Sequence, residues 1–280
     1  MSDDLDQEDQ YQDGPTAEEV YAWFKSLSPA DQAELLETMP KEERDDLLKI
    51  VEELDTRGDR KEVQEDFLAF VKQVWPEFIA GKHHAQMAEA FESVASGKCK
   101  RLIINMPPRH TKSEFASYLL PAWFLGKYPN KKIIQTSHTA ELAVGFGRKV
   151  RNLVDSEKYK RLFPTVELQS DSKAAGRWNT NFGGDYFAIG IGGAVTGKGA
   201  DLLIIDDPHS EQEAALAAGN PEVYDKVYEW YTSGPRQRLQ PGGSIVIVMT
   251  RWAERDLTGR VLADALAREK GEHWEVIELP

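Results

Sequence analysis

The sequence has no long hydrophobic run and only one cysteine. A membrane-spanning helix needs about 18 consecutive apolar residues, and the N-terminus is acidic where a secretory signal would be basic and then apolar. A lone Cys99 excludes both an intramolecular disulfide framework and a cysteine zinc site. The sequence therefore predicts a protein of a reducing cytosol without membrane contact. Its 280 residues are enough for one large domain and an appendage.

An excess of positive charge is also absent, since the formal net charge is −13. Residues 1–60 hold nineteen Asp and Glu against six Lys and Arg, whereas residues 61–280 hold twenty-eight of each. The acidity therefore lies in a leader, and the remainder is neutral. A neutral domain can still present a local basic face, so the overall charge does not exclude a nucleic acid partner.

The leader has two parts. Residues 1–14 carry many charges and few apolar groups, which predicts disorder. From Thr16 to Leu54 apolar residues recur at helical spacing, and Ser28-Pro29 is typical of a helix start, so we expect two or three short helices. Residues 55–60 are the expected linker to a domain at 61–280. The leader is either a solvated helical hairpin or an acidic docking or autoinhibitory element that competes with DNA.

A phosphate-binding loop is the central prediction. The apolar run Leu102–Met106 is typical of a buried strand, the next turn contains two prolines, and residues 113–125 have helical spacing. A loop between such a strand and helix points N–H groups at an anion. Lys112 would reach the outer phosphates of a nucleotide and the hydroxyl of Ser113 would bind Mg²⁺. An exposed helix start is the alternative interpretation of this motif alone.

This loop lacks the two glycines of the usual G-x-x-x-x-G-K-[ST] pattern, because Met106 and Thr111 occupy their positions. If the backbone at position 111 needs a positive φ, threonine is strained there. Such strain would slow turnover or require a rearranged loop.

A second motif supports the first. Residues 201–207 read Asp-Leu-Leu-Ile-Ile-Asp-Asp, an apolar strand that ends in two carboxylates. Asp206 is the predicted metal carboxylate. Asp207 stands where P-loop NTPases usually have a catalytic glutamate. Either Asp207 or Glu211 is therefore the candidate for orienting the water that attacks the phosphate. A turn or helix cap would explain one carboxylate at the end of an apolar strand, but explains two poorly.

The other elements alternate between strand and helix, which predicts an α/β fold with a mostly parallel sheet covered by helices on both faces. Strands are expected at 132–137, 244–249 and 274–279, a hairpin at 177–191, and helices at 63–74, 82–94, 139–159, 221–231 and 257–269. The glycine-rich segment 190–199 could lie near the nucleotide or DNA. A basic cluster is a candidate for phosphate contact; its members are Arg148, Lys149, Arg151, Lys158, Lys160 and Arg161.

Three segments carry a family resemblance. They are Met-Pro-Pro-Arg-His-Thr-Lys-Ser (106–113), Thr-Gly-Lys-Gly-Ala-Asp-Leu-Leu-Ile-Ile-Asp-Asp-Pro (196–208), and Met-Thr-Arg-Trp (249–252) with Asp-Leu-Thr-Gly-Arg (256–260). In this order they resemble the large terminase subunit of tailed bacteriophages, over roughly residues 66–280. The resemblance implies a P-loop NTPase fold of the additional-strand (ASCE) type, preceded by the small acidic helical segment.

The resemblance also implies roles for single residues. Arg109 is a candidate arginine finger, in cis or in trans, with Arg251 as its competitor, and Thr250 resembles the polar residue that couples hydrolysis to movement. His84 and Gln86 resemble an upstream segment that contacts the adenine, the alternative being an ordinary helix start. Nucleotide binding is assigned to the loop residues Pro108, Arg109, His110, Thr111, Lys112, Ser113 and Glu114.

The implied activity is Mg²⁺-dependent ATP hydrolysis that drives double-stranded DNA into an empty capsid. The implied partners are the portal protein, the small terminase subunit and further copies in a ring, at the portal vertex in the host cytoplasm. A nuclease domain usually follows in this family, so we expect a truncated or naturally split subunit without nuclease activity. The alternatives are another DNA-dependent, helicase-like ATPase and a silenced nucleotide-binding module.

Overall fold

A computed structural model describes residues 14–217, 219–268 and 272–279. The chain divides into two units, residues 1–61 and 62–280. The disorder predicted for residues 1–14 falls, except for Gly14, outside the described residues.

Unit 1 contains the helices α1 (Ala17–Ser26), α2 (Pro29–Thr38) and most of α3 (Lys41–Glu65). Ser28 caps α2 and Pro29 takes its first turn, as the sequence predicts. Phe24 and Leu47 are its most buried apolar side chains. A core this small fits the few apolar residues that the leader contains.

The predicted linker at residues 55–60 is wrong, because these residues lie inside α3, which is one helix of 25 residues. Gly58 is tolerated within it at a modest cost in helix propensity. Asp55 accepts hydrogen bonds from Tyr21 Oη (2.6 Å) and Lys25 Nζ (2.8 Å), both on α1. These tertiary contacts stabilise the helical conformation of residues 55–60, although the composition of this segment is typical of a loop.

Unit 2 is built on one sheet, which eight strands of the described chain form in the order β3-β4-β5-β2-β6-β7-β1-β8. β3, β4 and β5 pair antiparallel, and all other pairs are parallel. The predicted mostly parallel sheet is therefore confirmed. The strands are β1 (Arg101–Asn105), β2 (Lys132–Ser137), β3 (Leu168–Ala174), β4 (Arg177–Thr180), β5 (Asp185–Gly190), β6 (Ala200–Asp206), β7 (Leu239–Met249) and β8 (Glu275–Glu278).

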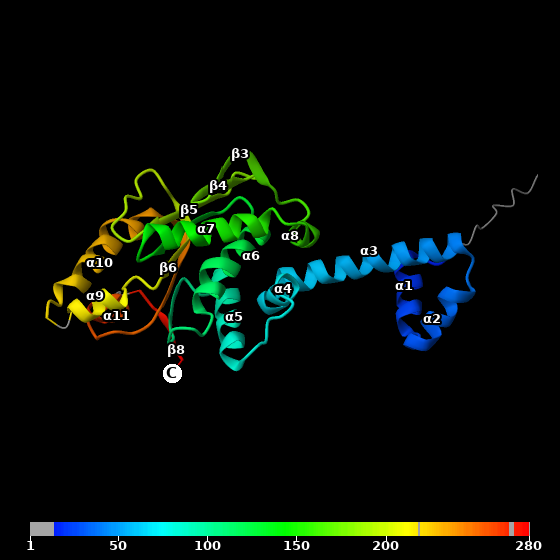
Figure 1. Ribbon diagram of the computed structural model, residues 1–280, viewed down its shortest axis with the longest axis horizontal. Helices are drawn as coiled ribbons and strands as arrows, with labels where there is room; N and C mark the ends of the chain where they lie inside the picture. The colour runs from blue at the N-terminus through cyan, green and yellow to red at the C-terminus, as the bar shows by residue number, and fades with distance from the viewer. Residues whose placement is uncertain (1–13, 218, 269–271, 280) are drawn as a thin grey trace, which may run out of the picture. The chain divides into compact units, whose positions relative to one another are not determined.

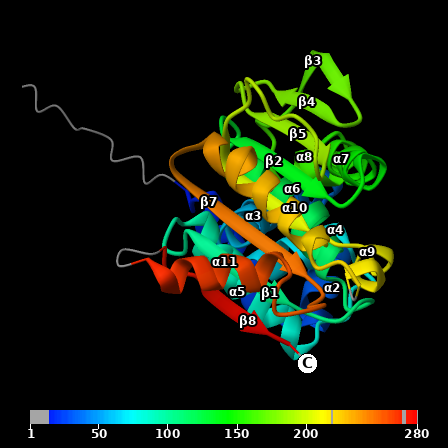
Figure 2. The same cartoon turned by 90° about the vertical axis from the view of Figure 1, so that its left-hand side faces the viewer.

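Helices cover both faces of this sheet (Figures 1 and 2). Successive residues of a strand point to opposite faces, so Leu102 and Ile104 of β1 pack with α4 to α8, whereas Ile103 packs with α10 and α11. The helical segments are α4 (Phe67–Val74), α5 (Lys82–Ala95), η1 (Glu114–Leu119), α6 (Leu120–Lys127), α7 (Ala140–Val154), α8 (Glu157–Leu162), α9 (Glu211–Ala217), α10 (Glu222–Ser233), η2 (Pro235–Arg238) and α11 (Leu257–Ala267).

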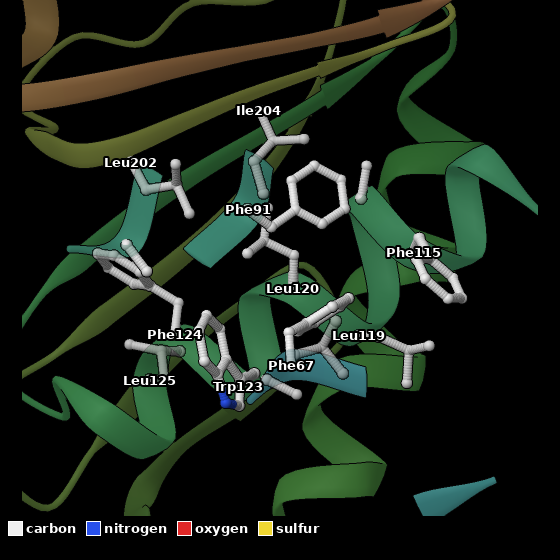
Figure 3. Packing of buried hydrophobic residues seen from close by; sticks show 14 of the residues in the cluster. Phe67, Phe91, Phe115, Leu119, Leu120, Trp123, Phe124, Leu125, Leu202 and Ile204 are labelled. Atoms are coloured by element: carbon white, nitrogen blue, oxygen red, sulfur yellow. The ribbon is translucent and has the colours of Figure 1, made fainter. Parts of the chain in front are cut away.

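An aromatic cluster packs the helices next to the loop that follows β1, which is predicted to bind phosphate (Figure 3). The ring of Phe67 lies edge-on to Phe91, Phe115 and Trp123, with centroid distances of 5.6, 5.6 and 5.3 Å. Such pairs add to the stabilisation from burial alone. The cluster thereby joins α4 and α5 to η1, the segment that begins directly after the loop.

Several elements differ from the sequence prediction. The helix expected over 139–159 is two helices, α7 and α8, and the helix expected over 63–74 is divided at Asp66 between α3 and α4. The helix expected over 113–125 is present, but η1 is a π-helix in which Leu120 N donates to Phe115 O. Pro121 follows immediately and has no N–H to continue an α-helical ladder, which accounts for the wider turn. β3 was not expected, because most of its residues are exposed and its sequence has no apolar alternation. No helix among the described residues combines the length and apolarity that crossing a bilayer requires.

Candidate functional site

The central residues of the predicted site meet at the carboxyl ends of β1, β6 and β7. β7 lies between β6 and β1, so one additional strand separates β1, which precedes the loop with Lys112, from the strand that ends in Asp206. The carboxyl ends of parallel strands are the usual place for ligands in such folds. Lys112, Ser113, Asp207 and Thr250 are brought together there.

Lys112 lies at the centre of this group and is only 4% exposed. Its Nζ lies 2.8 Å from Asp207 Oδ2 and donates to Thr250 Oγ1 at 3.3 Å. Asp207 also accepts a hydrogen bond from Thr250 N at 2.9 Å, through Oδ1. One lysine therefore links the loop after β1 to the ends of β6 and β7, as a phosphate-binding lysine in this position would.

Asp206 is buried (1% exposed) beneath the start of η1. Its Oδ1 accepts from Ser113 Oγ at 2.9 Å and its Oδ2 from Ser117 Oγ at 2.8 Å. Burial and the charge of Asp207 raise the pKa of Asp206 to about 7, while the two serines and Lys112 favour its ionised form. Ser117 was not among the predicted site residues, although its spacing of one helical turn from Ser113 indicates a shared helix face.

These residues fit the magnesium ion that the resemblance implies. Mg²⁺ prefers oxygen ligands and usually takes one or two carboxylates beside phosphate oxygens and water. Ser113 and Asp206 offer a hydroxyl and a carboxylate in contact with each other. Within residues 14–217, 219–268 and 272–279, no group of three or more His, Cys, Asp or Glu side chains is arranged to hold a metal alone. A magnesium ion at Ser113 and Asp206 would take its remaining ligands from phosphate oxygens and water.

The two candidates for orienting water share one open cleft. Asp207 and Glu211 both line it, together with the loop residue Pro108. Asp207 has both carboxylate oxygens engaged, as described above, and its backbone φ is +40°. Glu211 is exposed at the start of α9. Both candidates therefore line the same cleft beside the loop that follows β1.

The candidate arginines lie in different surroundings. Arg109 is exposed on the loop and has a φ of +65°. Two hydrogen bonds restrain the side chain of Arg251: its Nε donates to the fully buried Asp256 at 3.0 Å, and its Nη2 donates to Ala253 O. Of the two, Arg109 is the more available to a bound phosphate. Both assignments as an arginine finger stay predictions.

The remaining loop residues have local partners. His110 is exposed, and its Nδ1 lies 2.9 Å from Pro108 O. Glu114 forms an ion pair with Lys149 at 2.6 Å. Thr111 has a φ of +64°, the left-handed conformation in which threonine is strained. The condition that sequence analysis set for strain at this position is therefore met.

The two residues expected near the adenine diverge. Gln86 is exposed on α5. His84, on the same helix, is buried, and its Nε2 lies 2.6 Å from Thr111 Oγ1. The adenine contact stays a prediction for both residues, while the structure shows that His84 contacts Thr111 in the loop after β1.

Most of the predicted basic cluster is engaged within the chain. Lys149 pairs with Glu114, and Lys160 with Asp155 at 3.3 Å. Arg151 donates to Lys173 O, and Lys158 to Val74 O. In the glycine-rich segment, Lys198 forms an ion pair with Asp185 at 2.6 Å. These contacts reduce the charge available for DNA phosphates, so Arg148, exposed on α7, is the best-placed member for that role.

Strand order, the lysine-bearing loop and the paired carboxylates together define a P-loop NTPase fold of the additional-strand type. No family model matches the sequence, and no curated protein does.

Among solved structures, the chain is similar to two phage large terminases. With the large terminase of bacteriophage HK97 it shares 15% identity at a TM-score of 0.47, over 76% of this chain and 43% of that one. With the large terminase of the thermophilic bacteriophage D6E in complex with ADP it shares 12% identity at a TM-score of 0.39, over 79% and 44%. The chain thus spans less than half the length of either protein.

Proposed function

We propose that this chain is the ATPase motor portion of a phage large terminase, which hydrolyses ATP with Mg²⁺ to move double-stranded DNA into a procapsid. One observation carries the proposal: Lys112 and Ser113, from one loop, each contact one of the two carboxylates that end β6. The sequence motifs around these residues resemble those of large terminases in kind and order.

Different residues of the site would have different roles in phosphoryl transfer. Lys112 would leave Asp207 for the outer phosphates and balance their charge. Ser113 and Asp206 would hold Mg²⁺, which neutralises charge on the phosphates when bound. Asp207 or Glu211 would orient the attacking water, and Arg109 would stabilise the charge that develops in the transition state. Thr250, whose hydroxyl lies 3.3 Å from both Lys112 Nζ and Met106 O, would sense the change at Lys112.

The partners belong to the same proposal. They are double-stranded DNA, the portal protein, the small terminase subunit and further copies of this chain in a ring at the portal vertex in the host cytoplasm. A ring would allow an arginine to act in trans. The acidic unit 1 would serve as a docking or autoinhibitory element in such an assembly.

The test is Mg²⁺-dependent phosphate release by the purified chain, with and without linear duplex DNA. We expect Lys112→Ala and Asp206→Ala each to abolish release. Lys226→Ala and Asp171→Ala are matched controls, because both side chains are exposed and lie outside the site. Equal release by the parent and the two site variants would refute the proposal.

A nucleotide-binding module without hydrolysis is the second candidate. It is favoured by the engagement of both oxygens of Asp207 and by the left-handed conformations at Thr111 and Asp207. ATP binding by the parent without phosphate release, even with DNA present, would support this candidate. Activity restored by Thr111→Gly would instead trace the loss to the loop.

A further inference from the structure

The left-handed conformation of Thr111 needs an explanation. A β-branched residue at positive φ brings its side chain close to its own backbone, and such residues persist only where their surroundings hold them. At +64°, Thr111 occupies the conformation that a glycine would adopt without strain. Some contact must therefore replace the freedom that the missing glycine would have supplied.

The side chain of Thr111 has two such contacts. Its Oγ1 donates to His110 O at 2.6 Å, and the same oxygen lies 2.6 Å from His84 Nε2. Because the hydroxyl proton is directed at His110 O, the oxygen is the acceptor toward His84. Thr111 is thus held from both sides, by its own loop and by a ring on α5.

The state of His84 agrees with this assignment. Gly81 N donates to His84 Nδ1 at 2.8 Å, so Nδ1 has no proton and Nε2 carries the one that Thr111 accepts. Burial and the nearby His83 lower the pKa of His84 to about 4, which leaves its ring neutral near pH 7. Each ring nitrogen therefore has one role and one partner.

The ring of His84 is also fixed in place. It is 6% exposed and lies against Phe78 and Phe115, with centroid distances of 4.7 and 4.9 Å. Phe115 belongs to η1 and to the aromatic cluster around Phe67. The donor at Nε2 is therefore anchored in the core of unit 2 rather than on a free surface side chain.

We propose that His84 is a positioning residue that holds Thr111 in the left-handed turn, so that the loop presents Lys112 and its N–H groups to phosphate without the usual glycine. This inference rests on the proposed function for its phosphate ligand. Thr111 O accepts the first helical hydrogen bond, from Phe115 N at 2.9 Å. A rotation at Thr111 would consequently disturb both Lys112 and the start of η1.

The experiment separates the two hydrogen bonds of the ring. His84→Gln keeps an N–H donor near the Nε2 position, whereas His84→Asn keeps only an acceptor toward Gly81. Both are combined with Thr111 and with Thr111→Gly. Binding of ATP and of inorganic tripolyphosphate, each with Mg²⁺, is measured by titration calorimetry.

We expect His84→Asn to weaken both ligands about tenfold, the effect of one hydrogen bond, and His84→Gln to weaken them about threefold or less. In the Thr111→Gly background, where the turn needs no brace, the loss from His84→Asn should fall to about twofold. Equal losses in both backgrounds, or a loss confined to ATP, would overturn the inference; the latter would indicate adenine contact.

A second measurement does not depend on the proposed function. If the parent binds neither ligand, the proposed function fails, and the brace is then judged on the ligand-free protein by thermal unfolding. His84→Asn should lower the melting temperature more with Thr111 than with Thr111→Gly. Additive shifts would overturn the inference even if nucleotide binding were demonstrated.

Discussion

The two loops that form the site are held in opposite ways. Thr111, in the loop after β1, and Asp207, directly after β6, both have positive φ although neither is glycine. Thr111 is held by His84, which lies outside the group of residues expected to touch phosphate. Asp207 is held by Lys112 and by Thr250 N, which belong to that group.

This difference has a consequence for ligand binding. A phosphate would compete for Lys112 and release Asp207 Oδ2, but it would leave the contact between His84 and Thr111 intact. On the proposed function, the loop would be preorganised for phosphate, whereas Asp207 and Lys112 would rearrange. A strained residue held by groups that move on binding can contribute to a switch, and one held by the core cannot.

The largest expected effect concerns the carboxylate side. Asp207→Asn should lower kcat for ATP hydrolysis by about 10² to 10⁴, the range for loss of a general base, with a smaller change in KM. Glu211→Gln, on the same cleft, should lower kcat by less than about tenfold, because its exposed carboxylate is not tied to Lys112. Steady-state phosphate release measures both.

The reverse order of these two effects would assign the water-orienting role to Glu211. It would also remove the proposed contrast between the two loops, since Asp207 would then serve only to hold Lys112 before nucleotide binds.

The sequence predicted the parts of the site that short motifs encode. Asp206 ends β6, and Lys112 and Ser113 follow β1 by one short loop, so their positions follow from local pattern and from the geometry of parallel strands. The brace at Thr111 could not be predicted, because it joins residues 27 positions apart through a core that sequence spacing does not reveal. Likewise, the tertiary contacts of Asp55 kept residues 55–60 in α3, where composition favoured a linker.

A smaller effect concerns pH and the loop side. His84 has a pKa of about 4 in the folded chain, below its ordinary value of 6.5. The unfolded chain therefore binds a proton that the folded chain does not between these values, and stability should fall as pH drops from 6.5 towards 4. This residue should contribute a slope of up to about 1.4 kcal/mol per pH unit.

His84→Gln removes the titrating ring and keeps a donor for Thr111, so it isolates this slope. Urea unfolding at several pH values between 4 and 7 should give a parent-minus-variant difference that shrinks as pH falls. A stability difference that does not depend on pH would mean that His84 is not buried as a neutral ring. The proposal that His84 holds the loop in place before a ligand binds would then be wrong.

The smallest expected effect uses Arg109, the third left-handed residue of the site. Arg109 is exposed, and the described part of the chain shows no hydrogen bond or ion pair for its guanidinium. Asn adopts positive φ more readily than Arg, so Arg109→Asn should stabilise the chain by about 0.5 to 1 kcal/mol, or about 1 to 4 °C in melting temperature.

Thr111→Asn should instead destabilise the chain, because the hydroxyl between His84 and His110 is lost. If both substitutions raise the melting temperature, intrinsic backbone preference outweighs the brace at Thr111. If Arg109→Asn raises the melting temperature and also lowers kcat, the strain at Arg109 is retained for its charge rather than for the fold.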